Sequence, residues 1–332
     1  MPSDVKARAE KAIAEKVFPG CVVGVVKKSG EREVRSFGNL TYDTDAPAVR
    51  EDTIYDLASV TKSIPTASLA LNFLNKEKFE LSDGVKKFIP ELQNDHGATI
   101  EDLLMYRVRG VQMSTLKDKK PEEISAYIFA HGFDAPPGKS EYTNLPGFLL
   151  GLVVERALGE SLDALAQKYF FDPLKMSHTT FFPNVRLTKS NISPTEVDVY
   201  GEVRGIVHDE SARVFAKAGR AVGHAGLFSN APDILNILEA LLQGKYPSVV
   251  EGAQRGLGWQ RAEPWFAGSH AGASVFGKTG FTGTSVVCDI ERGIAFVILS
   301  NRTYPKRPPD ASSIHSAINT FRTDIADILL VQ

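Results

Sequence analysis

Hydrophobic and polar positions follow a strand pattern near both ends of the chain and a helix pattern between them. Strand-like runs at 21–26 and 33–37 flank the turn signal Lys28-Ser29-Gly30 and predict a β-hairpin. Three β-branched runs predict further strands late in the chain, at 273–277, 284–289 and 294–299. Because strands occur at both ends, we expect one sheet to be built from the two terminal parts.

Helical patterns predict the remaining elements. Apolar residues lie nearly all round the stretch from Ser59 to about Asn75, which predicts a helix buried inside the protein. Pro65 has no backbone N–H to donate, so we expect a kink or a first turn of 3₁₀ type there. Start and stop signals predict further helices at 3–16, after Thr99, and at 121–132, 146–158, 232–242 and 311–329.

This order of elements predicts an α+β fold, in which an antiparallel β-sheet is flanked by helices and carries an inserted, mostly helical domain. We assign residues 1–80 and 220–332 to a discontinuous sheet domain and residues 81–219 to the helical domain. A cleft between two such parts is the natural place for an active site.

Composition and charge narrow the range of functions. The chain has 332 residues, of which 43% are hydrophobic, and this is enough to bury a sizeable core. The formal net charge of -2, with both signs interspersed, gives no reason to expect binding to nucleic acid or to an anionic membrane. No apolar run is long enough to span a bilayer, and no signal peptide is visible. We therefore expect a cytoplasmic protein, or an exported one if a leader has been removed.

Cysteine and histidine are both scarce. Cys21 and Cys288 lie in strand-like runs, which favours buried free thiols, although a disulfide between them stays open at this stage. None of the seven histidines has the spacing of metal ligands. We therefore expect neither a metal nor another cofactor.

The tetrapeptide Ser59-Val60-Thr61-Lys62 places a hydroxyl and an amine three positions apart. Residues at this spacing share one face of a helix. A serine hydroxyl becomes an effective nucleophile only when a base lies within hydrogen-bond reach, and Lys62 can meet that need. Because Ser-x-x-Lys also occurs by chance, this motif alone carries little weight.

Two further motifs are equally weak when each is taken alone. Tyr142-Thr143-Asn144 follows a proline-rich turn that predicts an exposed loop, where both side chains can face a cleft. Alternatively, Tyr142 packs against a wall and Asn144 caps the next helix. Lys278-Thr279-Gly280 ends a predicted strand just before Phe281, and suits either an extended anionic substrate or a solvated strand end.

The three motifs together, in this order, resemble the signature of the serine β-lactamase and penicillin-binding protein superfamily. The likeness runs from about Phe18 to Leu330, and Tyr-x-Asn as its second element is similar to class C β-lactamases and their esterase and D-aminopeptidase-like relatives. It implies a β-lactamase/transpeptidase-like fold and a covalent acyl-enzyme. The longer segments that carry it are Asp56-Leu-Ala-Ser-Val-Thr-Lys62, Pro136-Pro-Gly-Lys-Ser-Glu-Tyr-Thr-Asn144, Gly223-His-Ala-Gly-Leu-Phe-Ser229 and Gly277-Lys-Thr-Gly-Phe-Thr-Gly-Thr284.

The resemblance also implies roles for individual residues. Ser59 would be the nucleophile, and Lys62 and Tyr142 together would take its proton, with the identity of the base left open. The backbone amides of Ser59 and Phe281 would donate to the oxyanion that forms when Ser59 attacks a carbonyl.

A second group of residues would bind the substrate or hold the site in place. By the same resemblance, Asn144 would hold a substrate amide or tune Lys62. Lys278, followed by Thr279 and Gly280, would face a substrate carboxylate. His208 and His224 lie in segments that resemble the family near the cleft, and we expect them to be hydrogen-bonded scaffold.

Two features depart from the pattern of the relatives. Leu103–Gly110 stands where relatives commonly carry Leu-Leu-Thr-His-Thr-Ser-Gly, so we expect an altered cleft wall. Phe281 is bulkier than the residue that many β-lactamases place after Lys-Thr-Gly, which disfavours efficient β-lactam turnover. Lys278, by contrast, favours an anionic substrate.

These observations predict a serine hydrolase that cleaves an ester, β-lactam or amide bond in a small molecule or short peptide. Two alternatives stay open. One is a D-Ala-D-Ala carboxypeptidase or D-aminopeptidase that acts on cell-wall peptides. The other is a penicillin-binding sensor that is acylated without turnover.

Overall fold

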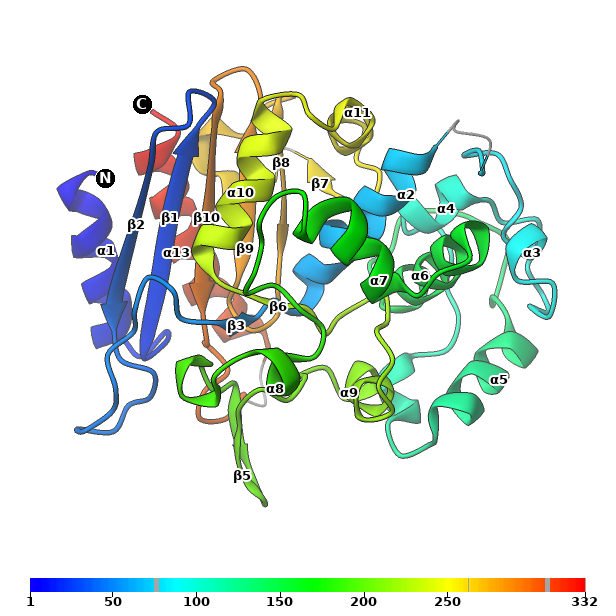
Figure 1. Ribbon diagram of the computed structural model, residues 1–332, viewed down its shortest axis with the longest axis horizontal. Coiled ribbons are helices and arrows are strands. Elements are labelled where there is room, and N and C mark those ends of the chain that lie inside the picture. Colours follow the sequence, from blue (N-terminus) through cyan, green and yellow to red (C-terminus); the bar gives the residue numbers. More distant parts are fainter. Residues whose placement is uncertain (75–77, 262, 308–310, 332) are drawn as a thin grey trace.

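The central element of the protein is an antiparallel sheet that joins the two ends of the chain. A computed structural model describes residues 1–74, 78–261, 263–307 and 311–331, with the backbone alone for 311–315. Within these residues the main sheet has six strands in the order β2-β1-β10-β9-β8-β7 (Figure 1). They are β1 (Gly20–Lys27), β2 (Arg32–Gly38), β7 (Gln260–Arg261), β8 (Val275–Thr279), β9 (Ser285–Asp289) and β10 (Ile294–Ser300). The predicted hairpin and the three late strands are confirmed, and β1 pairs directly with β10.

Helices cover both faces of this sheet. Helices α1 (Ser3–Ala14) and α13 (Ala311–Leu329) lie on one face, and α10 (Ala231–Leu242) crosses the other (Figure 1). Alternate residues of β1 divide between the two layers, because successive side chains of a strand point to opposite faces. Val23 joins the core under α1 and α13, whereas Val22 joins the larger core that contains α10. The predicted α+β arrangement with flanking helices is confirmed.

The two cysteines belong to different layers. Cys21 lies in the core beneath α1 and α13, whereas Cys288 lies in the core on the opposite face. Both are free and buried, and burial raises the pKa of each thiol. The sheet itself therefore separates them, and the question left open by the sequence resolves against a disulfide.

The remaining helices mostly lie away from the sheet (Figure 1). Their predicted ends are confirmed where sequence signals were present: Thr99 and Asp102 form a capping box, and Gly159 ends its helix in the left-handed region. The division into residues 1–80 with 220–332 and residues 81–219 stays a prediction. The helices are α2 (Ser68–Phe73), α3 (Val85–Phe88), α4 (Ile100–Leu104), α5 (Pro121–His131), α6 (Leu145–Leu158), α7 (Leu162–Ala166), α8 (Pro183–Arg186), α9 (Glu210–Lys217), α11 (Pro247–Gln254) and α12 (Pro264–Ala267). Two short pairings complete the description, β3 (Tyr55–Asp56) with β6 (Phe228–Ser229) and β4 (Glu196–Asp198) with β5 (Gly201–Val203).

The segment that begins near Ser59 is helical but irregular. A 3₁₀ turn (Ala58–Lys62) leads into a π turn (Ser63–Ala67) and then into α2. Ile64 has non-helical backbone angles just before Pro65. The kink and the 3₁₀ turn expected from Pro65 are both confirmed. Asn75, the predicted end of this helix, lies outside the described residues.

Glycines allow the segment around residue 223 to approach α6 closely. A Cβ atom on Gly223 would lie 2.3 Å from the carbonyl oxygen of Gly147 and 2.9 Å from the Cα atom of Gly151. Both distances are too short for a real side chain. This contact matters for the site because residue 224 follows directly.

We expect Gly223→Ala to lower the free energy of unfolding by about 1–3 kcal/mol, because backbone atoms must move apart to admit the methyl group. Thermal and urea unfolding would measure the change. Gly84→Ala is the matched control, since a Cβ there meets nothing within 4 Å and its φ of −64° suits any residue. Equal stability of the two variants would contradict this account of the contact.

Candidate active site

The turn before Ser59 is held in an unusual backbone conformation. Ala58 has a φ of 47°, in the left-handed region that non-glycine residues rarely adopt. The buried Asp56 carboxylate accepts hydrogen bonds from the backbone N–H groups of Ala58 (2.8 Å) and His208 (2.7 Å). These bonds fix the turn and attach it to the segment that carries the first of the two singled-out histidines.

The β8–β9 turn holds the same segment from the other side. The Thr282 hydroxyl donates to the carbonyl of Asp56 (2.7 Å), and the Thr284 hydroxyl donates to the carbonyl of Leu57 (2.9 Å). Gly280 lies so close that a Cβ there would be 2.4 Å from the Leu57 carbonyl oxygen. The first and third sequence motifs, far apart in the chain, are therefore joined through backbone carbonyls.

Lys62 makes the contact that the first motif predicted. Its Nζ lies 2.9 Å from Ser59 Oγ and 2.7 Å from the carbonyl oxygen of His224. The Lys62 side chain is buried, whereas Ser59 is half-buried and lines a pocket. The His224 carbonyl thus fixes the ammonium group beneath the serine, and the glycine contact at residue 223 positions that carbonyl.

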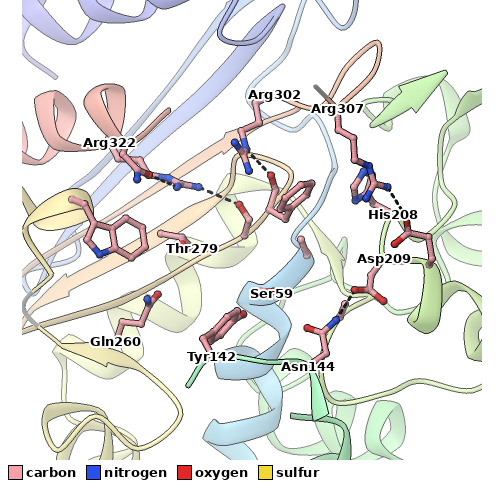
Figure 2. A pocket seen from close by; sticks show the side chains of 17 residues that line it. Ser59, Tyr142, Asn144, His208, Asp209, Gln260, Thr279, Arg302, Arg307 and Arg322 are labelled. Carbon is pink, nitrogen blue, oxygen red and sulfur yellow. Dashed lines mark hydrogen bonds and ion pairs between the residues drawn. The ribbon is translucent and has the colours of Figure 1, made fainter. Parts of the chain in front are cut away.

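Tyr142 stands at the rim of the pocket beside Ser59 (Figure 2). Its side chain is 51% exposed, and the Nζ atoms of Lys62 and Lys278 lie 5.3 Å and 4.6 Å from the centre of its ring. Desolvation by surrounding atoms opposes ionisation of the phenol, but the two positive charges, together with hydrogen bonding to Ser59 and Lys62, outweigh it and lower the pKa of Tyr142. The arrangement therefore favours Tyr142 as an acceptor of protons.

Lys278 lies behind this rim and not on the surface of the pocket. It is 1% exposed, and its Nζ donates to the hydroxyl of Tyr106 at 3.2 Å. Burial, together with the nearby charge of Lys62, lowers the pKa of Lys278 to about 8, although Tyr142 opposes the shift. The structure therefore places this lysine next to two tyrosine rings. Among the described residues that line the pocket are its neighbours Thr279 and Gly280, but not Lys278 itself.

Tyr106 is a site residue that the sequence analysis did not find. Its ring centre is 5.2 Å from that of Tyr142, and Lys278 Nζ lies 4.7 Å from the centre of the Tyr106 ring. Its φ of 55° is in the left-handed region. The available signal was the departure of Leu103–Gly110 from the pattern of relatives, which predicted an altered wall without saying which residue alters it.

Asn144 belongs to a polar network on the other side of Ser59. Its amide donates to Asp209 Oδ2 at 2.9 Å, so its side chain does not cap α6 (Figure 2). Ser211 donates to Asp209 Oδ1 at 2.7 Å, and His224 Nε2 lies 3.0 Å from Ser211 Oγ. Burial lowers the pKa of His224, and the charge of Lys62 adds to the effect against the attraction of Asp209. The His224 imidazole therefore links the Asp209 network that holds Asn144 to the backbone under Lys62.

The pocket in front of Ser59 has a volume of about 580 Å³. Ser59, Tyr142, Asn144 and Thr279 to Phe281 all line it, so the structure brings together most of the predicted site residues; Lys62 and Lys278 lie behind its wall. His208 also lines the pocket, with its ring stacked 5.7 Å from that of Phe281 and its Nε2 3.1 Å from Glu196 Oε1. His224 is fully buried behind the wall. No cluster of three or more His, Cys, Asp or Glu side chains that could hold a metal occurs in the part of the chain that is described.

A family model described as Beta-lactamase matches residues 5–318. The chain belongs to the beta-lactamase family. It is accordingly a serine hydrolase of this family. Among the residues described, no helix is long and apolar enough to cross a membrane.

Curated relatives of this beta-lactamase-family chain include an amidase and a putative carboxypeptidase. The "N-acetylmuramyl-L-alanine amidase" of Bacillus subtilis (strain 168) is 27% identical over 349 residues, covering 86% of this chain and 78% of that protein. The "Putative D-alanyl-D-alanine carboxypeptidase" of Escherichia coli (strain K12) is 29% identical over 310 residues, covering 76% of this chain and 70% of that protein.

Solved structures show the same fold at lower identity. A penicillin-binding protein homologue from Pyrococcus abyssi superposes with a TM-score of 0.76 and 20% identity, over 99% of this chain and 77% of that one. Simvastatin synthase from Aspergillus terreus gives a TM-score of 0.72 and 18% identity, over 99% and 97% of the two chains. The β-lactamase/transpeptidase-like fold expected from the three motifs is therefore confirmed.

We expect Tyr106→Phe to reduce kcat/KM about 10-fold near pH 8, since a hydrogen bond to a charged group contributes about 1.5–3 kcal/mol. Without the Tyr106 hydroxyl, the ammonium form of Lys278 loses a partner, so its pKa falls further and the defect grows as pH rises from 6 to 9. The pH profile of kcat/KM measures this. Tyr127→Phe on α5 is the matched control on an exposed tyrosine. A loss that is uniform with pH would contradict the assigned contact.

We expect Lys278→Gln to move the rising acid limb of the kcat/KM profile to higher pH by about one unit. An opposite charge within 4–6 Å typically lowers an acid's pKa by 1–3 units, so removing this cation raises the pKa of Tyr142. Lys278→Arg keeps the charge, and its limb should stay near that of the wild type. Identical limbs in the Gln and Arg variants would show that Lys278 does not influence the titrating group.

Proposed function

We propose that this protein hydrolyses an amide bond in a small, anionic, peptide-like substrate through an acyl-enzyme on Ser59. The single observation that supports this most strongly is the contact of 2.9 Å between Lys62 Nζ and Ser59 Oγ at the edge of an open pocket. A serine is activated when a proton acceptor lies within reach, and the lowered pKa of Tyr142 favours this phenol as the acceptor beside the Lys62 ammonium group.

The proposed reaction has two halves. In the first, Ser59 Oγ attacks the amide carbonyl while its proton passes to the pair of Lys62 and Tyr142. The C–N bond then breaks, the proton is delivered to the leaving nitrogen, and an ester to Ser59 remains. In the second half, water gives a proton to the same pair and attacks the ester, which releases the acid and restores the hydroxyl. Backbone amides of Ser59 and Phe281 are the proposed oxyanion donors, each contributing about 2.7–4 kcal/mol in comparable sites.

Two observations favour an amide over a β-lactam or a simple ester. The relatives with the higher identities carry the names amidase and carboxypeptidase, and both names describe amide hydrolysis. The Phe281 ring, which contacts His208 and the guanidinium of Arg302, adds bulk to one wall of the pocket, and this bulk disfavours a β-lactam. A D-alanyl carboxypeptidase is the second candidate, because its leaving group carries a carboxylate that suits a positively charged pocket.

We expect Ser59→Ala to abolish turnover of the correct amide substrate, because no nucleophile then remains at the position beside Lys62. The assay is a panel of an N-acyl amino acid, a D-Ala-D-Ala peptide, nitrocefin and p-nitrophenyl acetate. Ser29→Ala, an exposed turn residue, is the control. Undiminished activity in Ser59→Ala would end the nucleophile assignment.

The same panel tests the sensor alternative. A sensor releases one equivalent of a chromogenic leaving group per protein and then stops, whereas the proposed enzyme reaches a steady state. Mass spectrometry of the stalled protein would show whether an acyl group stays on Ser59.

A further inference from the structure

Two arginines, Arg302 and Arg322, line the pocket at the end away from Asn144 (Figure 2). They are 6% and 3% exposed, so both guanidinium groups are nearly removed from water. Among the described residues, neither has a carboxylate oxygen within 4 Å. An unpaired charge in such surroundings is costly, which makes this pair stand out from the rest of the pocket.

A third arginine in the same pocket shows the contrast. Arg307 Nε lies 2.6 Å from Glu196 Oε1, and its Nη2 lies 3.0 Å from Glu210 Oε1, so its charge is neutralised. Glu196 and Glu210 thus act as acidic partners for an arginine in this wall of the pocket. Arg302 and Arg322 have no such acidic partner among the side chains that the structure describes.

Backbone carbonyls and one amide hold the two guanidinium groups in place. Arg302 Nε donates to the Phe281 carbonyl at 2.6 Å, and Arg322 Nη2 donates to the carbonyls of Gly280 (3.1 Å) and Thr284 (2.9 Å). Arg322 Nη1 donates to Asn319 Oδ1 at 2.9 Å. Within the described residues, Arg302 Nη1 and Arg322 Nε are buried and have no hydrogen-bond partner. The two side chains are thus held in place, although not all of their N–H groups are hydrogen-bonded within the described residues.

The electrostatics of the pair agree with the geometry. Burial lowers the pKa of Arg302 to about 10, and burial together with the charge of Arg302 lowers the pKa of Arg322 to about 9. Both side chains are still charged at neutral pH. A ligand that brings negative charge would relieve the repulsion between them.

We propose that Arg302 and Arg322 form a subsite for a dicarboxylate, namely an acidic amino acid whose nitrogen belongs to the scissile amide. This inference rests on the proposed amide hydrolysis. An N-acyl amino acid always carries its α-carboxylate two bonds from the amide nitrogen, and an acidic side chain adds the second negative charge. Two guanidinium groups match two carboxylates in number and in charge, and a hydrogen bond from either group to a carboxylate is charge-assisted.

The test compares N-acyl-glutamate with N-acyl-glutamine, each as the D and the L form with one common acyl group. The two amino acids have nearly the same shape and differ by one charge. We expect wild-type kcat/KM to be about 10-fold higher for the better glutamate form than for its glutamine counterpart, the size of one charge-assisted hydrogen bond. A glutamate-to-glutamine ratio near one in both series would overturn the proposal.

Arginine variants test whether the glutamate-to-glutamine ratio of kcat/KM depends on Arg302. Arg302→Gln should bring the ratio close to one, whereas Arg302→Lys, which keeps a charge and a donor, should retain part of it. Because the ratio is taken within one variant, a general loss of activity cancels. Arg50→Gln, which removes an exposed arginine paired with Asp52, is the control and should keep the wild-type ratio. Thermal unfolding confirms that each variant is folded, and an unchanged ratio in folded Arg302→Gln would contradict the assignment.

A binding experiment separates this proposal from the catalytic one. Ser59→Ala protein is titrated calorimetrically with N-acyl-glutamate, N-acyl-glutamine and inorganic phosphate. Tighter binding of the glutamate compound, by about 10-fold over glutamine, supports the dicarboxylate subsite. Tightest binding of phosphate, or equal binding of the two amides, would overturn it. Full hydrolytic activity in Ser59→Ala would instead overturn the nucleophile assignment.

Discussion

Two buried ammonium groups close to one tyrosine ring are the constraint on which the rest of the site depends. Lys62 and Lys278 are both 1% exposed, and within the described ranges neither forms an ion pair with a carboxylate. Their partners are a hydroxyl, a backbone carbonyl, a phenol and aromatic faces. Buried charges persist only where such partners are firmly placed, so the surrounding backbone must be rigid.

Hydrogen bonds to backbone carbonyls and close backbone contacts hold this part of the structure in place. Two hydroxyls of the β8–β9 turn donate hydrogen bonds to the carbonyls just before Ser59. The close contact of Gly223 with α6 sets the position of the His224 carbonyl. The Asp209 network attaches Asn144 to the same backbone. Carboxylates are therefore present near the pocket, but backbone N–H groups and neighbouring side chains already occupy them. The pocket consequently presents positive charge although the whole chain is slightly acidic.

The sequence predicted what local spacing controls. The contact between Ser59 and Lys62 follows from a separation of three residues, and the strands, caps and the kink at Pro65 follow from short-range signals. Tyr106 could not be assigned because its position depends on a left-handed backbone turn after α4. Arg302 and Arg322 were also missed. Arg302 follows β10 and Arg322 lies on α13, and only the folded sheet brings the two together beside the β8–β9 turn.

The position of Lys278 bears on which positive charge acts on Tyr142 and which one is available to a substrate anion. From sequence, this lysine was expected to face a substrate carboxylate, yet its Nζ is enclosed by two tyrosines and its pKa is lowered to about 8. A cation in that position acts first on the Tyr142 phenol, 4.6 Å from ammonium to ring centre. The two arginines have the opposite character, because they line the cavity, hold their charge at neutral pH and, among the described residues, have no carboxylate partner. In this pocket, activation of the nucleophile and recognition of an anion are therefore best assigned to different cations.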